Sequence, residues 1–270
     1  MKIICDTPLF FSEKGNRENN EDAVYPSAGV FTGREDLFIV CDGVGGAARG
    51  EVASRMACTT FARYFSENKV EPSGECVLKA FNYVQIEFDN YLLKEPFAKG
   101  MGTTLVLLLF HNEGVTAAHC GDSRIYHFRN GRIIWRTMDH TPVNDLVRQG
   151  IITTEEALQR PKSNRITRAI QGYSVHRSFP DIQLISNILP GDIFFLCSDG
   201  VYETLSDNNL SQVFASENTL SQKMEIIKNT CESHSGDNYS GYLIEIKSVE
   251  TEPVKKNRFS YFRKFAKNDD

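Results

Sequence analysis

Residues 103–137 constrain the fold of this chain more than any other segment. The stretch reads TTLVLLLFHNEGVTAAHCGDSRIYHFRNGRIIWRT, in which apolar runs of strand length alternate with HNEG, GDS and RNG. Short breaks rich in glycine, asparagine and aspartate are typical of β-hairpins. We therefore expect an antiparallel meander here and not a parallel crossover unit.

Helical periodicity appears on both sides of this segment. Residues 51–66 are expected to form a helix that buries Val52, Met56 and Thr59 or Thr60. Residues 75–93 are expected to form a second helix, whose apolar positions are Val77, Leu78, Phe81, Val84, Phe88 and Leu92. The other expected elements are strands at 37–42, within 192–200 and at 241–246, and helices at 142–149, 154–159, 207–215 and 219–233.

Composition excludes several classes of protein. The net charge of −5, from 30 basic and 35 acidic residues, argues against a general nucleic-acid binder. No apolar run approaches the ~18 residues of a membrane span, and the N-terminal sequence has no secretory signal pattern. The seven cysteines form no CxxC pair, and Cys41, Cys120 and Cys197, each at the end of an apolar run, suit small buried side chains in a reducing cytoplasm. Without an HExxH or HxH pattern, we expect no zinc site of the Cys/His kind.

The last residues differ in chemistry from the rest. Residues 253–267, PVKKNRFSYFRKFAK, hold six basic side chains and no acidic one, so without them the net charge would fall from −5 to −11. We interpret residues 248–270 as a basic, aromatic tail outside the folded domain. A disordered, solvated tail is the favoured interpretation, and weak contact with an anionic membrane surface or a partner is the alternative.

Five aspartates lie in similar local sequences, mostly at the ends of expected strands. They are Asp22, Asp42, Asp122, Asp199 and Asp237, and four of the five adjoin a glycine. If they converge on one edge of a sheet, their carboxylates repel one another unless a divalent cation neutralises them. Ligation by oxygen atoms alone favours Mg²⁺ or Mn²⁺ over zinc. The alternative is that the five aspartates lie in unrelated turns by coincidence.

The segment CDGVGGAARGE, residues 41–51, has two further interpretations. A glycine-rich turn between a strand and a helix can hold a phosphate group, and GVGGAA fits the GxGxxA pattern of nucleotide-binding oxidoreductases. That pattern is weak here, because a meander follows instead of a βαβ unit. A tight turn without chemistry is the other possibility.

The ordered motifs RENNED, CDGVGG with GEVAS, GMGTTLV, CGDSRIY, ITRAIQG, CSDGVYETLSD and GDN resemble the metal-dependent protein phosphatases of type 2C (PPM), and most of all the compact bacterial members. The resemblance covers about residues 10–247. It implies an α+β fold, a four-layer α-β-β-α sandwich with two central antiparallel sheets. It also implies a catalytic domain at 1–247 with a flap at about 141–171.

The resemblance also implies roles for individual residues. Asp42 and the Gly43 carbonyl match metal ligands, as do Asp199 and Asp237, while Glu21 and Asp22 match residues that act through metal-bound water. Asp122 matches a ligand of a third, weaker metal, and Arg17 matches the arginine that binds the substrate phosphate. Val44 stands where many eukaryotic members have a histidine proposed as the general acid. Ser123 and Arg124 are interpreted as structural, and His119, His127 and His140 as core or surface residues.

The function implied is a metal-dependent phosphoserine/phosphothreonine protein phosphatase. Two tightly bound Mn²⁺ or Mg²⁺ ions would activate a water that attacks the phosphoryl group, with a third ion bound more weakly. The implied partner is a phosphorylated protein, opposite a Ser/Thr kinase, and the chain is expected to be a cytoplasmic monomer. A pseudophosphatase, a phosphoprotein-binding module of the same fold, is the alternative.

Overall fold

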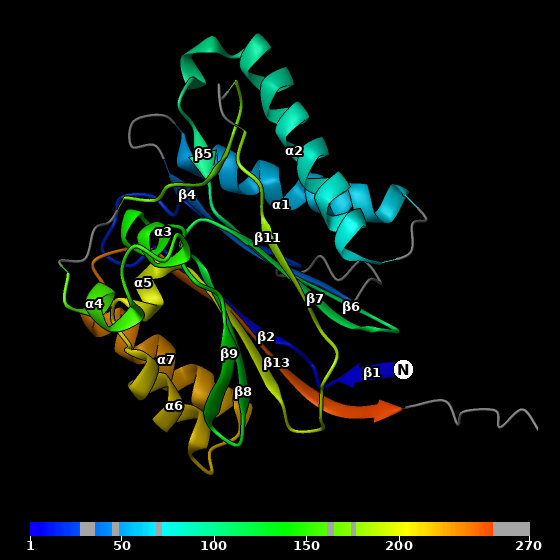
Figure 1. Ribbon diagram of the computed structural model, residues 1–270, viewed down its shortest axis with the longest axis vertical. Coiled ribbons are helices and arrows are strands. Elements are labelled where there is room, and N and C mark those ends of the chain that lie inside the picture. The colour runs from blue at the N-terminus through cyan, green and yellow to red at the C-terminus, as the bar shows by residue number, and fades with distance from the viewer. Residues whose placement is uncertain (28–35, 45–48, 69–71, 161–164, 174–176, 251–270) are drawn as a thin grey trace, which may run out of the picture.

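The computed structural model describes residues 1–27, 36–44, 49–68, 72–160, 165–173 and 177–250. Two antiparallel sheets pack against each other in the middle of the molecule. Helices α1 and α2 cover one side, and α6 and α7 cover the opposite side (Figure 1). The expected α+β class and four-layer sandwich are therefore confirmed.

The first sheet joins seven strands among the described residues. Its order is β10-β5-β4-β6-β7-β11, and β3 also pairs with β4. The strands are β3 (Asp22–Tyr25), β4 (Leu37–Val44), β5 (Gly102–Thr103), β6 (Leu105–His111), β7 (Gly114–Cys120), β10 (Ile170–Gln171) and β11 (Asp181–Ile185).

The second sheet joins six described strands. Its order is β1-β13-β12-β8-β9, and β2 also pairs with β13. The strands are β1 (Lys2–Cys5), β2 (Leu9–Glu13), β8 (Arg124–Arg129), β9 (Arg132–Arg136), β12 (Ile193–Cys197) and β13 (Tyr239–Glu250).

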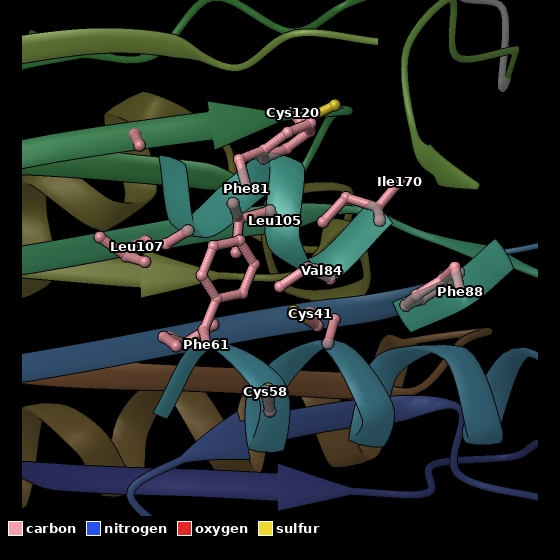
Figure 2. Packing of buried hydrophobic residues seen from close by; sticks show 14 of the residues in the cluster. Cys41, Cys58, Phe61, Phe81, Val84, Phe88, Leu105, Leu107, Cys120 and Ile170 are labelled. Carbon is pink, nitrogen blue, oxygen red and sulfur yellow. The ribbon is translucent and has the colours of Figure 1, made fainter. Parts of the chain in front are cut away.

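Central strands are apolar on both faces because each sheet is covered on both sides. In β4, Ile39 and Cys41 face helices α1 and α2, whereas Phe38 and Val40 face the other sheet. Figure 2 shows Phe61 of α1 among the side chains that fill the helix-facing layer. Three apolar layers result, one beneath each pair of helices and one between the sheets.

The expected helices are present with ends shifted by at most one residue. They are α1 (Gly50–Glu67), α2 (Gly74–Lys94), α3 (Pro142–Arg148), α4 (Thr154–Leu158), α6 (Asp207–Ala215) and α7 (Leu220–His234). The expected buried face of α1 was only partly correct, with Thr60 buried as expected. Ala53, Ala57 and Phe61 face the core, while Val52 and Met56 are half-buried. Small residues face β4, since α1 packs closely against that strand.

The expected meander is only partly correct. HNEG closes the β6–β7 hairpin and RNG closes the β8–β9 hairpin. The GDS turn closes no hairpin, because β7 belongs to the seven-stranded sheet and β8 to the six-stranded one. Gly121 has a φ of +110°, and a Cβ there would lie 2.7 Å from Thr104 Cγ2. The turn carries the chain from one sheet to the other and sets Asp122 between them.

Several elements were not expected from the sequence: β1, β2, β3, β11, the short β5 and β10, the 3-10 turn Pro96–Ala98 and the one-turn helix α5 (Asp199–Tyr202). Strand β13 continues to Glu250, so residues 248–250 of the predicted tail belong to the sheet, where they pair with β1. Residues 251–270 and part of the predicted flap, 161–164, lie outside the described residues. Among the described helices, none has the length and apolar character of a membrane span.

Candidate metal centre

Five aspartates gather at one end of the sandwich. Asp22 opens β3 and is in register with Asp42 near the end of β4. The end of β4 is paired near the start of β6, which in turn pairs with the end of β7, directly before Asp122. In the other sheet, Asp199 follows β12 and Asp237 precedes β13, at strand ends paired through Cys197 and Gly241. The predicted convergence is therefore present, and it draws on both sheets.

The carboxylates perturb one another strongly. Burial, followed by the charges of Asp22 and Asp199, raises the pKa of Asp42 well above its usual range. Burial, followed by the charges of Asp122 and Asp237, raises the pKa of Asp199 to about 8. Burial also raises the pKa of Asp22 and of Asp122 to about 6 each. Such shifts mark a place where negative charge is concentrated without compensation.

Asp22 connects the two sheets. Ser198 Oγ donates a 2.7 Å hydrogen bond to Asp22 Oδ2, and the same Oγ accepts a 3.0 Å bond from the Ser240 amide. The side chain of Asp22 is almost fully buried, and its Oδ1 atom has no hydrogen-bond partner. A buried acceptor without a partner is costly unless water or an ion satisfies it.

Glycine is required at positions 43 and 50 by close approach of the backbone. A Cβ on Gly43 would lie 2.3 Å from the Gly50 carbonyl oxygen, and a Cβ on Gly50 would lie 2.5 Å from Glu21 Oε2. The Gly43 amide donates to the Glu21 carbonyl at 3.0 Å. The tight turn thus packs the beginning of α1 against Asp42 and Glu21. Residues 45–48 of the GxGxxA pattern lie outside the described residues.

The backbone of Asp42 is fixed by two threonines. Its amide donates to Thr104 Oγ1 at 3.0 Å, and its carbonyl accepts from Thr103 Oγ1 and the Thr104 amide, each at 2.8 Å. Thr104 Oγ1 lies 2.6 Å from Ser123 Oγ, next to Asp122. The GMGTTLV and CGDSRIY motifs therefore meet, and Ser123 has a structural contact as expected.

Arg17 lies beside the cluster through Asp237. Its Nη2 atom is 2.7 Å from Asp237 Oδ2, and its side chain is 58% exposed. The other oxygen, Asp237 Oδ1, accepts from the Asn238 amide at 2.8 Å. A carboxylate has about four acceptor positions, so both oxygens keep capacity for a further ligand.

Asn238 anchors the loop that carries Arg17. Its Oδ1 accepts from the Glu21 amide at 2.9 Å, and its Nδ2 donates to the carbonyls of Lys14 and Asn19. It holds both RENNED and GDN in place. The residues that follow it, 239–241, begin β13.

A second group of residues, which we call the 137–140 clamp (Thr137, Met138, Asp139 and His140), holds the Asp122 turn. His140 exchanges two hydrogen bonds with Gly121, each 2.9 Å long. Asp139 accepts two bonds from Arg124, 2.9 and 2.8 Å long. We did not predict the clamp or Ser198. The sequence TMDHT, residues 137–141, is visibly polar, but its spacing does not indicate which residues it contacts.

His119, His140 and Asp181 also lie together, with ligand atoms within 4.8 Å of one another. His119 Nε2 faces the Met138 carbonyl at 2.9 Å, and His140 Nδ1 accepts from Gly121. These contacts put a proton on the Nε2 atom of each neutral ring, so neither nitrogen can bind a cation there. Arg148 and Arg168 already neutralise Asp181. The group fits a structural contact better than a metal site.

The aspartate cluster fits a hard divalent cation. Its donors are all oxygen atoms, and it holds an unpartnered buried carboxylate oxygen. Burial, and after it neighbouring negative charge, raises the pKa of Asp22, Asp42, Asp122 and Asp199. Among the described residues, these aspartates form no group with all ligand atoms within 4.8 Å.

Comparisons with known proteins agree with the geometry. The family model for protein phosphatase 2C matches residues 12–233. The chain is 31% identical to the serine/threonine phosphatase Stp of Listeria monocytogenes over 87% of this chain and 94% of that protein. It is 31% identical to PstP of Mycobacterium tuberculosis over 88% of this chain. The match spans 45% of PstP, or about half of its length.

Solved structures give the same result. Stp1 of Staphylococcus aureus superimposes with a TM-score of 0.76 at 31% identity, covering 89% of this chain and 95% of that one. The PstP catalytic domain, solved in complex with two manganese ions, has a TM-score of 0.71 at 30% identity, covering 90% of this chain and 98% of that one. The predicted resemblance is confirmed: the chain belongs to the protein phosphatase 2C family.

Proposed function

We propose that the chain is a metal-dependent phosphoserine/phosphothreonine protein phosphatase. The observation that carries this proposal is the convergence of Asp22, Asp42, Asp122, Asp199 and Asp237 on one end of both sheets, in a chain of this family. A pseudophosphatase is not favoured, because none of the expected metal-binding aspartates is missing.

Asp42, Asp199, Asp237 and the Gly43 carbonyl would hold two divalent ions, Mn²⁺ or Mg²⁺. When bound, the ions would act as Lewis acids and supply an activated water as nucleophile. The two manganese ions in the related PstP structure support this number. Glu21 and Asp22 would act through water, since Ser198 already occupies one oxygen of Asp22. Asp122 would hold a third ion weakly, because it is a single carboxylate on the sheet-crossing turn.

Arg17 would bind and orient the substrate phosphate. A guanidinium group can contact two phosphate oxygens while one of its nitrogens remains on Asp237. The pair with Asp237 pre-orients the guanidinium group, and its exposure leaves it accessible to a phosphoprotein. Val44 carries no titratable group, so the leaving oxygen would take its proton from water.

The partner would be a phosphorylated protein, opposite a Ser/Thr kinase, and the chain would act as a cytoplasmic monomer. The seven cysteines form no disulfide in the described part of the chain, which agrees with a reducing compartment. Residues 251–270 would form a solvated tail beyond β13, with weak membrane contact as the alternative. Co-sedimentation with anionic vesicles, lost on truncation after Glu250, would favour the membrane alternative.

Hydrolysis of a phosphothreonine peptide tests the function. We expect turnover with Mn²⁺, loss of turnover in excess EDTA, and recovery when Mn²⁺ is restored. Arg17→Ala should lower kcat/KM by about 30-fold, the loss of one charge-assisted contact of about 2 kcal/mol. Full activity after EDTA and dialysis would contradict the proposal.

A further inference from the structure

A pocket of about 650 Å³ adjoins the carboxylate cluster, and its size is typical of ligand sites. It lies between the Arg17 loop, the segment after α5, and the end of α7. Its lining includes Arg17, Glu203, Leu205, Thr230, His234 and Asp237. No role assigned above uses Glu203, Leu205, Thr230 or His234.

The pocket is continuous with the site of the proposed chemistry. Arg17 and Asp237 line it and also belong to the carboxylate cluster. Glu203 stands one turn after Asp199, and its amide donates to the Asp199 carbonyl at 2.9 Å. A phosphorylated residue held at Arg17 would therefore place its neighbours along the substrate chain at the mouth of this pocket.

Most polar groups of the lining already have partners within the protein. Thr230 Oγ1 donates to the Ile226 carbonyl, and His234 Nδ1 contacts the Thr230 carbonyl. Ser235 Oγ, which also lines the pocket, donates to the Gly200 carbonyl. The cation of Arg17 is paired with Asp237. These atoms are therefore not free to pair with a ligand.

Glu203 is the acidic side chain of the described lining that has no such partner. Its side chain forms no hydrogen bond or ion pair to any described residue, and the residue is exposed. Beside it, Leu205 lines the pocket with the small part of its side chain that is not packed in the core. One unpaired carboxylate next to an apolar floor suits a side chain with an alkyl stem and a cationic end, which arginine and lysine combine.

We propose that this pocket receives an arginine or lysine side chain of the substrate, close in sequence to the phosphorylated residue, with Glu203 as the residue that pairs with it. The inference rests on the proposed phosphatase function and adds a substrate preference to it. It makes Glu203 a determinant of specificity that acts on flanking sequence and not on the phosphate.

A set of phosphothreonine peptides tests the preference. The peptides are identical except for one arginine, moved through the three positions on each side of the phosphothreonine, with alanine as the reference residue. We expect kcat/KM to rise about tenfold for arginine at one or two positions on one side, the effect of a single charge pair of moderate strength. Glutamate at the same position should lower kcat/KM.

The ratio of kcat/KM for the arginine and alanine peptides separates this role from effects on metal binding or folding. Glu203→Gln should bring the ratio close to one, and Glu203→Lys should reverse it in favour of glutamate. Glu225→Gln, an exposed glutamate of α7 outside the pocket, is the matched control and should keep the wild-type ratio. Thr230→Lys places a competing cation in the pocket from another element and should also reduce the ratio.

The outcomes distinguish failure of the pocket proposal from failure of the proposed function. A wild-type enzyme that hydrolyses all peptides equally, or a Glu203→Gln variant that keeps the preference, overturns the pocket proposal and leaves the phosphatase function intact. If Glu203→Gln does not fold, the ratio of kcat/KM for the arginine and alanine peptides is measured on Thr230→Lys instead. An unchanged ratio in that variant overturns the pocket proposal. Failure to hydrolyse any peptide with Mn²⁺ overturns the proposed function and this inference together.

Discussion

Asp199 is placed where its charge is least favourable. It begins α5, shortly after the buried strand β12, and it shares its surroundings with Asp122, Asp237 and Asp22. Burial and these neighbouring carboxylates raise its pKa to about 8, against an ordinary value of 3.8. Without a cation, the folded protein therefore retains a proton on this group that the unfolded chain releases.

The stability of the metal-free protein should depend on pH through this group. Between about pH 4 and pH 8 the folded state binds more protons at Asp199 than the unfolded state, so the free energy of unfolding falls as the pH rises. Asp199→Asn removes this dependence. In EDTA, the variant should gain stability relative to the wild type on going from pH 5 to pH 8, by on the order of 1 kcal/mol per unit.

Urea unfolding at the two pH values measures this effect. Glu217→Gln, at an exposed position, should change neither the stability nor its pH dependence. The same Asp199→Asn variant should be inactive with Mn²⁺, since it lacks a proposed ligand. A variant that is less stable than the wild type at pH 8 in EDTA would show that Asp199 is not in conflict with its neighbours.

At the scale of elements, the turn from β7 to β8 is the feature that assembles the site. Gly121, Asp122 and Ser123 carry the chain between the sheets, and the 137–140 clamp fixes both ends of this turn. Arg124, at the start of β8, is bound by the clamp. It forms two bonds to Asp139, and its guanidinium carbon lies 3.6 Å from the centre of the Tyr202 ring in α5.

Arg124→Lys should therefore destabilise the fold by about 2–3 kcal/mol, because lysine can replace neither the two parallel bonds nor the stacking. Arg136→Lys is the matched control, since Arg136 pairs with Asp207 at a more exposed position. Its cost should stay below about 1 kcal/mol. Urea unfolding of both variants measures the loss in free energy of unfolding. Equal losses would show that Arg124 stabilises the fold no more than Arg136 does.

The same turn marks the limit of prediction from the sequence. The periodicity of residues 75–93 predicted α2 correctly, because the apolar residues of an amphipathic helix recur at the helical repeat and mark its buried face. A hairpin turn and a turn between sheets both use glycine and aspartate, so GDS could not indicate which sheet receives the next strand. Strands β2 and β11 are short and partly exposed, and they lack the apolar run that identified β4.

At the scale of the whole molecule, the site belongs to neither sheet alone. The aspartate pattern predicted convergence because turns at strand ends gather at one edge of a sheet. Partners such as Ser198 and Asn238 could not be predicted, because their contacts join Asp22 and Glu21 across more than 170 residues of chain. Such contacts depend on how the two sheets are aligned, which no local pattern encodes.

Removal of metal should therefore loosen one end of the sandwich and leave the other unchanged. Carboxylates from both sheets meet at the cluster, and a cation between them replaces repulsion with attraction. With Mn²⁺ at about 100 times its Kd, the free energy of unfolding should rise by about 2.7 kcal/mol over the value in EDTA. Hydrogen exchange of backbone amides locates the effect.

Amides at the end of β4, such as Gly43, and at the start of β13, such as Ser240, should exchange more slowly when Mn²⁺ is bound. Amides that pair β1 with the far end of β13, from Lys2 to Cys5, should keep their rates under conditions of local opening. Uniform protection along the sheets would indicate a global effect on stability alone. Unchanged exchange at Gly43 and Ser240, with Mn²⁺ bound, would show that the cation does not join the two sheets.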